Sequence, residues 1–188
     1  MCFEDEARQN LTPPRGRTWG RRGRTPIVKV RERSSGRISI AKILAWRPGA
    51  RTRLFYRLRV HRPRHKKERR SLPERDYISL LDGVHQQLRA SIILVWDRLN
   101  THVSRAMKRL IGQRAWLSVV LLPFYAPDLN PAEGIWSHVK RSLASLAACG
   151  LDRLEALIRA RLKSLQYRPR VLDGFLKGSG LSLCPDPP

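Results

Sequence analysis

Apolar residues alternate with polar ones, or follow one another almost without a break, over short stretches separated by glycine, proline or charged residues. Such stretches are typical of β-strands, and Pro48-Gly49 between two of them is typical of a hairpin turn. Two stretches, 92–96 and 116–122, are almost entirely apolar, which indicates strands that are buried on both faces. The predicted strands cover residues 1–6, 27–33, 38–46, 53–60, 91–96 and 116–122.

A helical period replaces this pattern in other segments, where apolar residues recur three and four positions apart. In the first of them, for example, Tyr77, Leu81 and Val84 fall on one face. Strands that are followed by alternating helices and strands indicate an α/β fold with a mixed central sheet flanked by helices. The predicted helices cover residues 73–89, 102–112, 130–147 and 152–167.

The length of 188 residues and the hydrophobic fraction of 41% suit one folded domain. We expect this domain to cover residues 1–183 and a frayed, proline-rich tail to cover 184–188. Three cysteines without C-x-x-C spacing argue against a disulfide framework or a zinc site, and they favour a reducing, cytoplasmic compartment. No stretch is long and apolar enough for a membrane span, and the N-terminus has no signal-peptide pattern.

The formal net charge of +23 and the pI near 11.5 are typical of a protein that binds nucleic acid. Solubility, or contact with any anionic surface, is the alternative explanation. Segment 12–26 is rich in proline, glycine and arginine, which predicts an extended basic loop that follows phosphates. Trp19 would stack on a base there or pack locally. The arginines of this predicted DNA-binding loop are Arg15, Arg17, Arg21, Arg22 and Arg24.

Acidic residues are rare between the first and the last predicted helix, where only Asp97, Asp128 and Glu133 occur. Asp97 directly follows an apolar strand, at the kind of sheet edge where ligand sites collect. It could instead cap the next helix or pair with Arg98. Glu133 stands three residues after Asn130 in a capping-box arrangement, so a purely structural role is equally consistent. Asp128 suits a turn.

Asp5 ends the first predicted strand between two glutamates, and an exposed acidic terminus would explain it. If this strand pairs with the strand that ends before Asp97, the two carboxylates approach each other. Like charges at that distance are unfavourable unless a cation lies between them. Hard oxygen ligands favour Mg²⁺ or Mn²⁺, and two such ions suit phosphoryl transfer on DNA.

Residues 95–102 (VWDRLNTH) and 125–136 (YAPDLNPAEGIW) resemble the two later signature blocks of DDE transposases. The closest group is the bacterial insertion-sequence family related to mariner elements. Residues 3–6 (FEDE) resemble the first block of that family, and the similarity covers essentially the whole chain. The 35 residues between Asp97 and Glu133 are close to the family's spacing.

The resemblance implies a ribonuclease H-like fold with Asp5 and Asp97 on adjacent strands and Glu133 on a helix that crosses them. These three residues would be catalytic and would hold two Mg²⁺ or Mn²⁺ ions. The implied reaction cleaves the ends of an insertion sequence and joins the freed 3′-hydroxyl to target DNA at a TA step. The protein could act as a homodimer, and its implied location is the bacterial nucleoid. Lys140 and Arg141 are further expected to contact DNA. Asn100, His102 and Asn130 are expected to be positioning residues, and packing is an equal alternative for His102.

Two features depart from the family pattern. The family usually has asparagine where this chain has Arg98, and that arginine would either compete with a cation for Asp97 and Glu133 or point away. The chain also starts inside the first strand, so we expect a short strand and no helix–turn–helix region for recognising element ends. The alternative is therefore a catalytically inactive, truncated remnant that binds DNA non-specifically. A ribosomal or nucleoid structural protein would explain the charge but not the acidic blocks.

Overall fold

The computed structural model describes residues 1–12, 14, 21–23, 36–62, 71–124, 126–144 and 150–180. In this part of the chain one sheet has the strand order β3-β2-β1-β4-β5. β1 pairs antiparallel with β2, which pairs antiparallel with β3, whereas the β1–β4 and β4–β5 pairs are parallel. The strands are β1 (Cys2–Asn10), β2 (Arg37–Ala45), β3 (Arg53–His61), β4 (Ile92–Trp96) and β5 (Leu117–Leu121).

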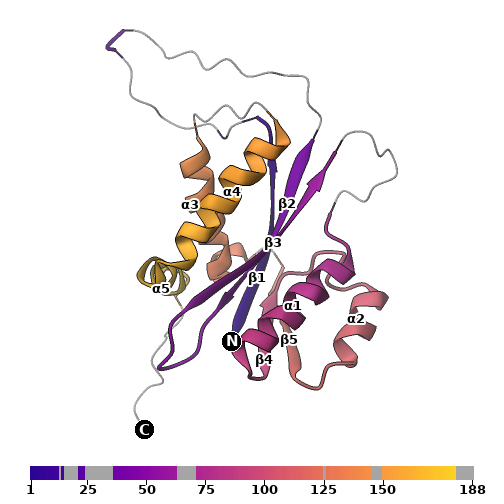
Figure 1. Cartoon of the computed structure of the whole chain (residues 1–188). Helices are drawn as coiled ribbons and strands as arrows, with labels where there is room; N and C mark the ends of the chain where they lie inside the picture. Colours follow the sequence, from indigo (N-terminus) through magenta and orange to yellow (C-terminus); the bar gives the residue numbers. More distant parts are fainter. Residues whose placement is uncertain are drawn as a thin grey trace.

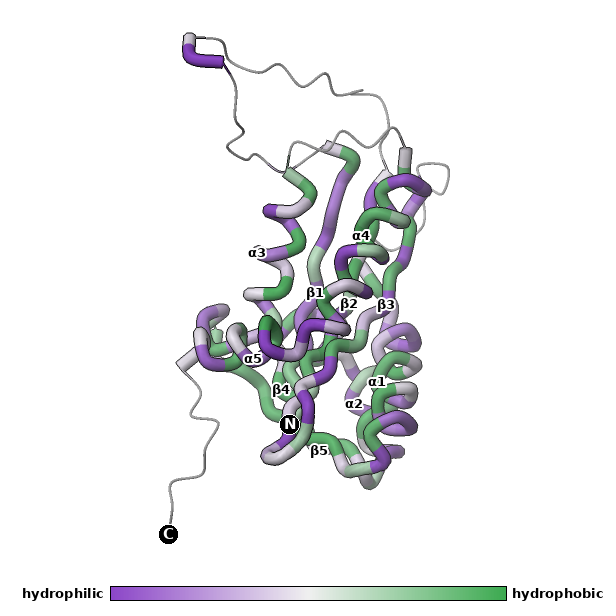
Figure 2. The backbone as a smooth tube through the Cα atoms, turned by 60° about the vertical axis from the view of Figure 1, so that its left-hand side comes forward, coloured by the Kyte–Doolittle hydropathy of each residue, from purple (hydrophilic) through white to green (hydrophobic). Residues whose placement is uncertain are grey.

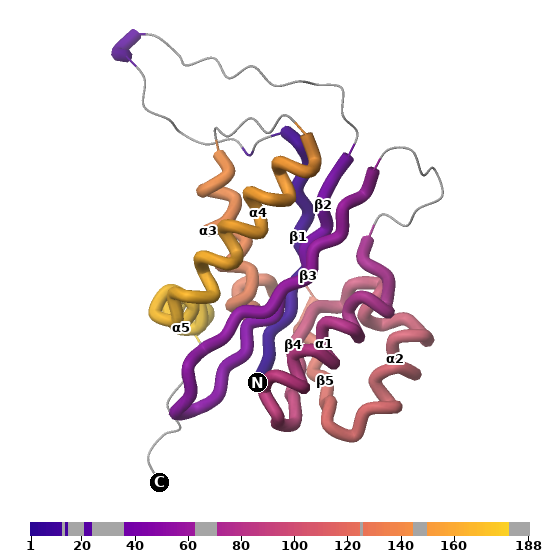
Figure 3. Tube along the Cα trace, in the orientation of Figure 1, coloured from indigo at the N-terminus to yellow at the C-terminus, as the bar shows by residue number. Residues whose placement is uncertain are grey.

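Helices cover the two faces of the sheet in separate groups (Figure 1). On one face lie α1 (Glu74–Leu88) and α2 (Arg105–Gly112), which share an apolar core with the strand residues that point their way. On the other face lie α3 (Pro131–Leu143), α4 (Leu151–Gln166) and α5 (Pro169–Gly178), over a second core. The tube in Figure 3 shows β1 running between these two layers, and the expected mixed sheet flanked by helices is confirmed.

The first strand is longer than predicted. It continues to Asn10 rather than stopping at residue 6, and it pairs with β2 over its whole length. The expectation of a short first strand is therefore wrong, because residues 7–10 are held by this antiparallel pairing although Arg8 and Asn10 are polar and exposed. Alternation puts Phe3 and Ala7 in the core under α3 and α4, and Cys2 in the core under α1.

The predicted strand 116–122 forms, but as the edge strand β5 rather than a buried one. Val120 is 50% exposed, and Ile93, which points to the same face from β4, is 47% exposed. The green bands of β4 and β5 in Figure 2 mark how apolar these strands are. An apolar run does not by itself distinguish a central strand from an edge strand, so the predicted burial is wrong here.

Helix boundaries differ from the predictions in ways that capping explains. α2 begins at Arg105, not at residue 102, because the Ser104 hydroxyl accepts a hydrogen bond from the Met107 amide and caps the helix at that point. α3 ends at Leu143 rather than at residue 147. The short helix α5 was not predicted, since it shows only one buried apolar pair, Leu172 and Leu176. The predicted strand 27–33 lies outside the described residues.

Within the described residues, no helix has the length and apolar character that a membrane crossing needs.

Two adjacent isoleucines of β4 test the arrangement of the layers. Ile92 is 2% exposed in the core under α1, whereas Ile93 faces the opposite, open side of the sheet. We expect Ile92→Ala to lower the free energy of unfolding by about 2–5 kcal/mol, and Ile93→Ala to lower it by less than about 1 kcal/mol. Urea unfolding followed by far-ultraviolet circular dichroism measures both. Equal losses would show that the outer face of β4 is covered.

Candidate active site

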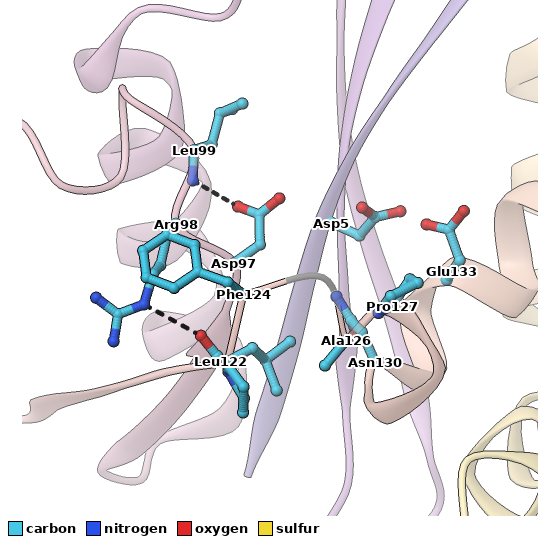
Figure 4. Close-up of a pocket in the computed structure, with 11 residues that line it drawn as sticks. Asp5, Asp97, Arg98, Leu99, Leu122, Phe124, Ala126, Pro127, Asn130 and Glu133 are labelled. Atoms are coloured by element: carbon cyan, nitrogen blue, oxygen red, sulfur yellow. Dashed lines mark hydrogen bonds between the residues drawn. The ribbon is translucent and has the colours of Figure 1, made fainter.

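Three acidic residues from distant parts of the sequence line one pocket of about 380 Å³. Asp5 comes from the middle of β1, Asp97 follows the last residue of β4, and Glu133 lies in the first turn of α3 (Figure 4). Phe3 is paired with Val95 in the parallel β1–β4 ladder, so two residues further along the same register bring Asp5 beside Asp97. The predicted pairing of these strands is confirmed.

Asn130 sets the position of Glu133 by joining α3 to β1. Its side-chain oxygen accepts a hydrogen bond from the Ala132 amide at 3.1 Å and caps the helix, and its Nδ2 donates to the Glu4 carbonyl at 2.8 Å. Pro131 follows at the first helical position, which suits a residue without a backbone N–H. The capping box is incomplete, because the Asn130 amide donates to the Pro127 carbonyl and Glu133 points toward Asp5 instead. The positioning role expected of Asn130 therefore has a structural basis.

Asp97 is oriented by two donors on the loop that follows it. Its Oδ1 accepts hydrogen bonds from the Leu99 amide at 3.0 Å and from His102 Nδ1 at 2.8 Å. The bond from His102, followed by that from Leu99, lowers the pKa of Asp97 against the opposing effect of burial. The carboxyl group is 55% exposed, so its second oxygen remains accessible from the pocket. Asp97 thus stays ionised in a fixed orientation.

His102 connects Asp97 to a second, fully buried acid. Its ring stacks on Trp96 at 4.1 Å between centroids, and its Nε2 lies 3.3 Å from Glu4 Oε2. Burial raises the pKa of Glu4 to about 8, although His102 opposes this shift. Burial would lower the pKa of His102, but Glu4 and Asp97 together outweigh it and raise that pKa. His102 therefore lies packed between two carboxyl groups, and its expected role in positioning a ligand stays a prediction.

Lys42 is the residue that the sequence patterns did not reveal. It lies in the middle of β2 directly opposite Asp5, it is 0% exposed, and its ammonium forms an ion pair with Asp5 Oδ2. Buried lysines are rare unless they are paired. A single lysine inside the apolar segment 38–45 was the available signal, but it has meaning only once the β1–β2 register is known.

Glu133 is exposed and faces Asp5 across the pocket (Figure 4). Burial and the negative charge of Asp5 raise the pKa of Glu133, whereas Lys42 and Lys140 oppose that shift. In the part of the chain that the structure describes, no three acidic, histidine or cysteine side chains are close enough to hold one ion together. The acids therefore face one another in pairs.

The other candidate site residues near these acids do not contact them. Arg98 points away from the acids: its Nε donates to the Leu122 carbonyl and its guanidinium lies 4.7 Å from the centre of the exposed Phe124 ring. Of the two alternatives for Arg98, competition with a cation is thus excluded in this arrangement. Asn100 is exposed and does not line the pocket, and Asp128 lies in an exposed 3-10 turn.

The basic residues expected to contact DNA are only partly described. Arg21 and Arg22 are exposed, whereas the other arginines of the basic loop and Trp19 lie outside the described residues. Lys140 and Arg141 are exposed on α3, and the Lys140 ammonium lies 5.9 Å from the centre of the Trp136 ring. Trp136 is in the core. Positive charge therefore continues along the helix that carries Glu133.

Known proteins resemble this chain in sequence and in fold. The family profile described as DDE superfamily endonuclease matches residues 1–155. No curated protein matches the sequence significantly. Among solved structures, the Mos1 transposase paired-end complex with left transposon end has a TM-score of 0.61 at 13% identity, over 95% of this chain and 55% of that one. The chain thus spans about half the length of that protein.

Two further structures of the same transposase are described as complexes with a metal ion. The mariner Mos1 paired end complex with Mg has a TM-score of 0.64 at 12% identity, over 95% of this chain and 53% of that one. The Mos1 transposase catalytic domain with raltegravir and Mn has a TM-score of 0.57 at 13% identity, over 97% of this chain and 84% of that one. At these identities the similarity shows the fold, which is the ribonuclease H-like fold of that catalytic domain.

The buried Glu4–His102 contact predicts that metal-free protein loses stability as pH rises from about 5 to about 9. Because the pKa of Glu4 is raised from 4.5 to about 8, the folded state keeps a proton that the unfolded state has released. The raised pKa of His102 acts in the same direction above about 6.5, where the unfolded imidazole loses its proton. Both contributions are complete at low pH and are lost as pH rises through the folded pKa values. We expect a fall of more than about 1 kcal/mol.

Urea unfolding in the presence of a chelator, followed by tryptophan fluorescence across this pH range, measures the slope. Glu4→Gln keeps the size of the side chain but removes its titration, so it should flatten the slope. Asp128→Asn, which changes an exposed loop acid, should leave it as in the wild type. Parallel curves for wild type and Glu4→Gln would contradict the assignment.

Proposed function

Because the chain belongs to the DDE superfamily endonuclease family, we propose that it is a transposase catalytic domain that cleaves DNA and joins the cut strand to a target. The observation that carries the proposal is the convergence of Asp5, Asp97 and Glu133 on one pocket. Three acids from distant sites are unexpected at one place in a chain of net charge +23, unless they bind cations. A DNA substrate also suits this charge.

Asp5, Asp97 and Glu133 would hold two Mg²⁺ or Mn²⁺ ions. Their oxygen atoms are the ligands that these ions prefer, and burial together with the negative charge of Asp5 raises the pKa of Glu133, a shift that a bound cation would oppose. When bound, such ions activate the attacking oxygen and stabilise the leaving oxygen in phosphoryl transfer. His102 keeps Asp97 ionised and directed toward the pocket. Asn130 fixes the position of Glu133 relative to β1.

In the first proposed reaction water attacks a phosphorus atom at the end of the element, and the 3′-oxygen leaves as a 3′-hydroxyl. In the second reaction that hydroxyl attacks a phosphorus atom of the target, at a TA step, and releases another 3′-hydroxyl. No net oxidation occurs, and the number of phosphodiester bonds is conserved in the second step. The exposed lysine and arginine side chains on α3 and in the basic loop would hold the DNA through its phosphates.

The finer parts of the proposal come from the sequence. They are the bacterial insertion-sequence group related to mariner elements, DNA of the element ends as partner, a homodimer, and a location at the nucleoid. The Mos1 structures support the DNA partner, because one is described as a complex with a transposon end.

A catalytically inactive remnant that binds DNA non-specifically is the second candidate. One observation favours it: the Lys42 ammonium already neutralises Asp5 from inside the sheet. The charge and the fold would be kept in such a remnant, while the phosphoryl transfer would be lost.

Nicking of supercoiled plasmid in the presence of Mn²⁺ tests the proposed function. We expect the full chain to nick, and Asp97→Asn or Glu133→Gln to reduce the rate about 100-fold or more, because each removes a charged ligand. Asp128→Asn is the matched control, since Asp128 is an exposed acid of the same signature block that does not line the pocket. It should nick at the wild-type rate.

Circular dichroism and a gel-shift assay on the same proteins complete the test. If folded wild-type protein binds DNA but does not nick it, the remnant is the correct description. If Asp97→Asn nicks as fast as the wild type, the activity belongs to a contaminant or to another site.

A further inference from the structure

Lys42 occupies an unusual place for a lysine. It lies in the second strand of the sheet between the buried residues Ala41 and Ile43, with no exposed surface. The β1–β2 register puts it directly opposite Asp5, and its ammonium binds Asp5 Oδ2. Because both residues of such a pair point to the same face of the sheet, the ammonium lies on the side that α3 covers.

The charge of Lys42 reaches the second acid of the pocket as well. β2 and β4 pair with opposite edges of β1, so Lys42 approaches Asp5 from the side away from Asp97. Figure 4 shows the carboxylates of Asp5 and Glu133 turned toward each other, with Asp97 on the opposite side of Asp5. The ammonium therefore acts on the Asp5–Glu133 pair, while Asp97 is held separately by His102 and Leu99.

We propose that the Lys42 ammonium replaces one of the two divalent ions, the one that Asp5 and Glu133 would otherwise share. The chain then binds a single Mg²⁺ or Mn²⁺ ion, on the Asp5–Asp97 side. This inference rests on the proposed function, because it assumes that these acids bind metal. Lys42 would then add to the aspartates and the glutamate of the site a positive charge that the fold holds in place.

Electrostatics explains why the second ion is excluded. A divalent ion between Asp5 and Glu133 would meet an ammonium that already binds Asp5, and like charges at that distance repel strongly. The ammonium cannot move aside at low cost, because its side chain is fully enclosed and a buried charge that loses its partner is strongly destabilising. The Asp97 side lacks this obstacle, because Asp97 follows β4, which pairs with the edge of β1 away from β2 and Lys42, and because Arg98 points away from it.

Counting bound Mn²⁺ tests the proposal without any measurement of activity. The full chain, stripped of metal, is titrated with Mn²⁺, and the free ion is read from its electron paramagnetic resonance signal. We expect one ion per wild-type chain. Lys42→Ala removes the ammonium and should bind a second ion about tenfold or more tightly than the wild type does. Lys140→Ala is the matched control, because Lys140 also acts on Glu133 but is exposed, and it should leave the count at one.

The outcomes separate the two proposals. Two ions of similar affinity on the wild-type chain would overturn the role of Lys42 while leaving the proposed function intact. This result needs no variant, so it stands even if Lys42→Ala does not fold, in which case Lys42→Met keeps the length of the side chain. One ion on both the wild type and Lys42→Ala would also overturn it. Binding that Asp97→Asn leaves unchanged would overturn the proposed function and this inference together.

Discussion

The site depends on the position of β1 between an antiparallel neighbour, β2, and a parallel one, β4. The parallel pairing brings Asp5 to the end of β4, where Asp97 begins the next loop. The antiparallel pairing puts Lys42 opposite Asp5. A hydrogen bond from Asn130 to the backbone of β1 adds the start of α3. Because side chains alternate along a strand, Glu4 and Asp5 point to opposite faces of the sheet. One strand therefore supplies Asp5 to the pocket and Glu4 to the buried contact with His102.

Three basic side chains lie on elements next to these acids, and each has a different effect. His102 is enclosed between Asp97 and Glu4, which fixes the orientation of Asp97. Lys42 neutralises Asp5 from within the sheet. Arg98, the nearest cation in sequence, is held by a backbone carbonyl and an aromatic ring instead. The number of positive charges along the chain therefore says little about the site. What matters is which of them the strand register and the loop after β4 direct to the carboxylates.

Much of the fold and the identity of the three acids could be predicted from the sequence. Apolar runs and a proline–glycine turn locate β2 to β5, and the blocks that resemble DDE transposases indicate Asp5, Asp97 and Glu133. Apart from the approach of Asp5 to Asp97, contacts between residues distant in sequence could not be predicted. The Lys42–Asp5 pair needs the register of two strands, and the Glu4–His102 contact needs the loop after β4 to return to β1. The edge position of β5 likewise follows from strand order, which an apolar run does not encode.

Backbone cleavage by bound Fe²⁺ tests most directly whether these segments form one metal site. Fe²⁺ replaces Mg²⁺ or Mn²⁺, and with ascorbate and peroxide it generates radicals that cut the chain only near the ion. The account predicts cuts near residues 5, 97 and 133 together, all suppressed by excess Mn²⁺ and all lost in Asp97→Asn. Cuts that miss these segments, or that persist in Asp97→Asn, would contradict it.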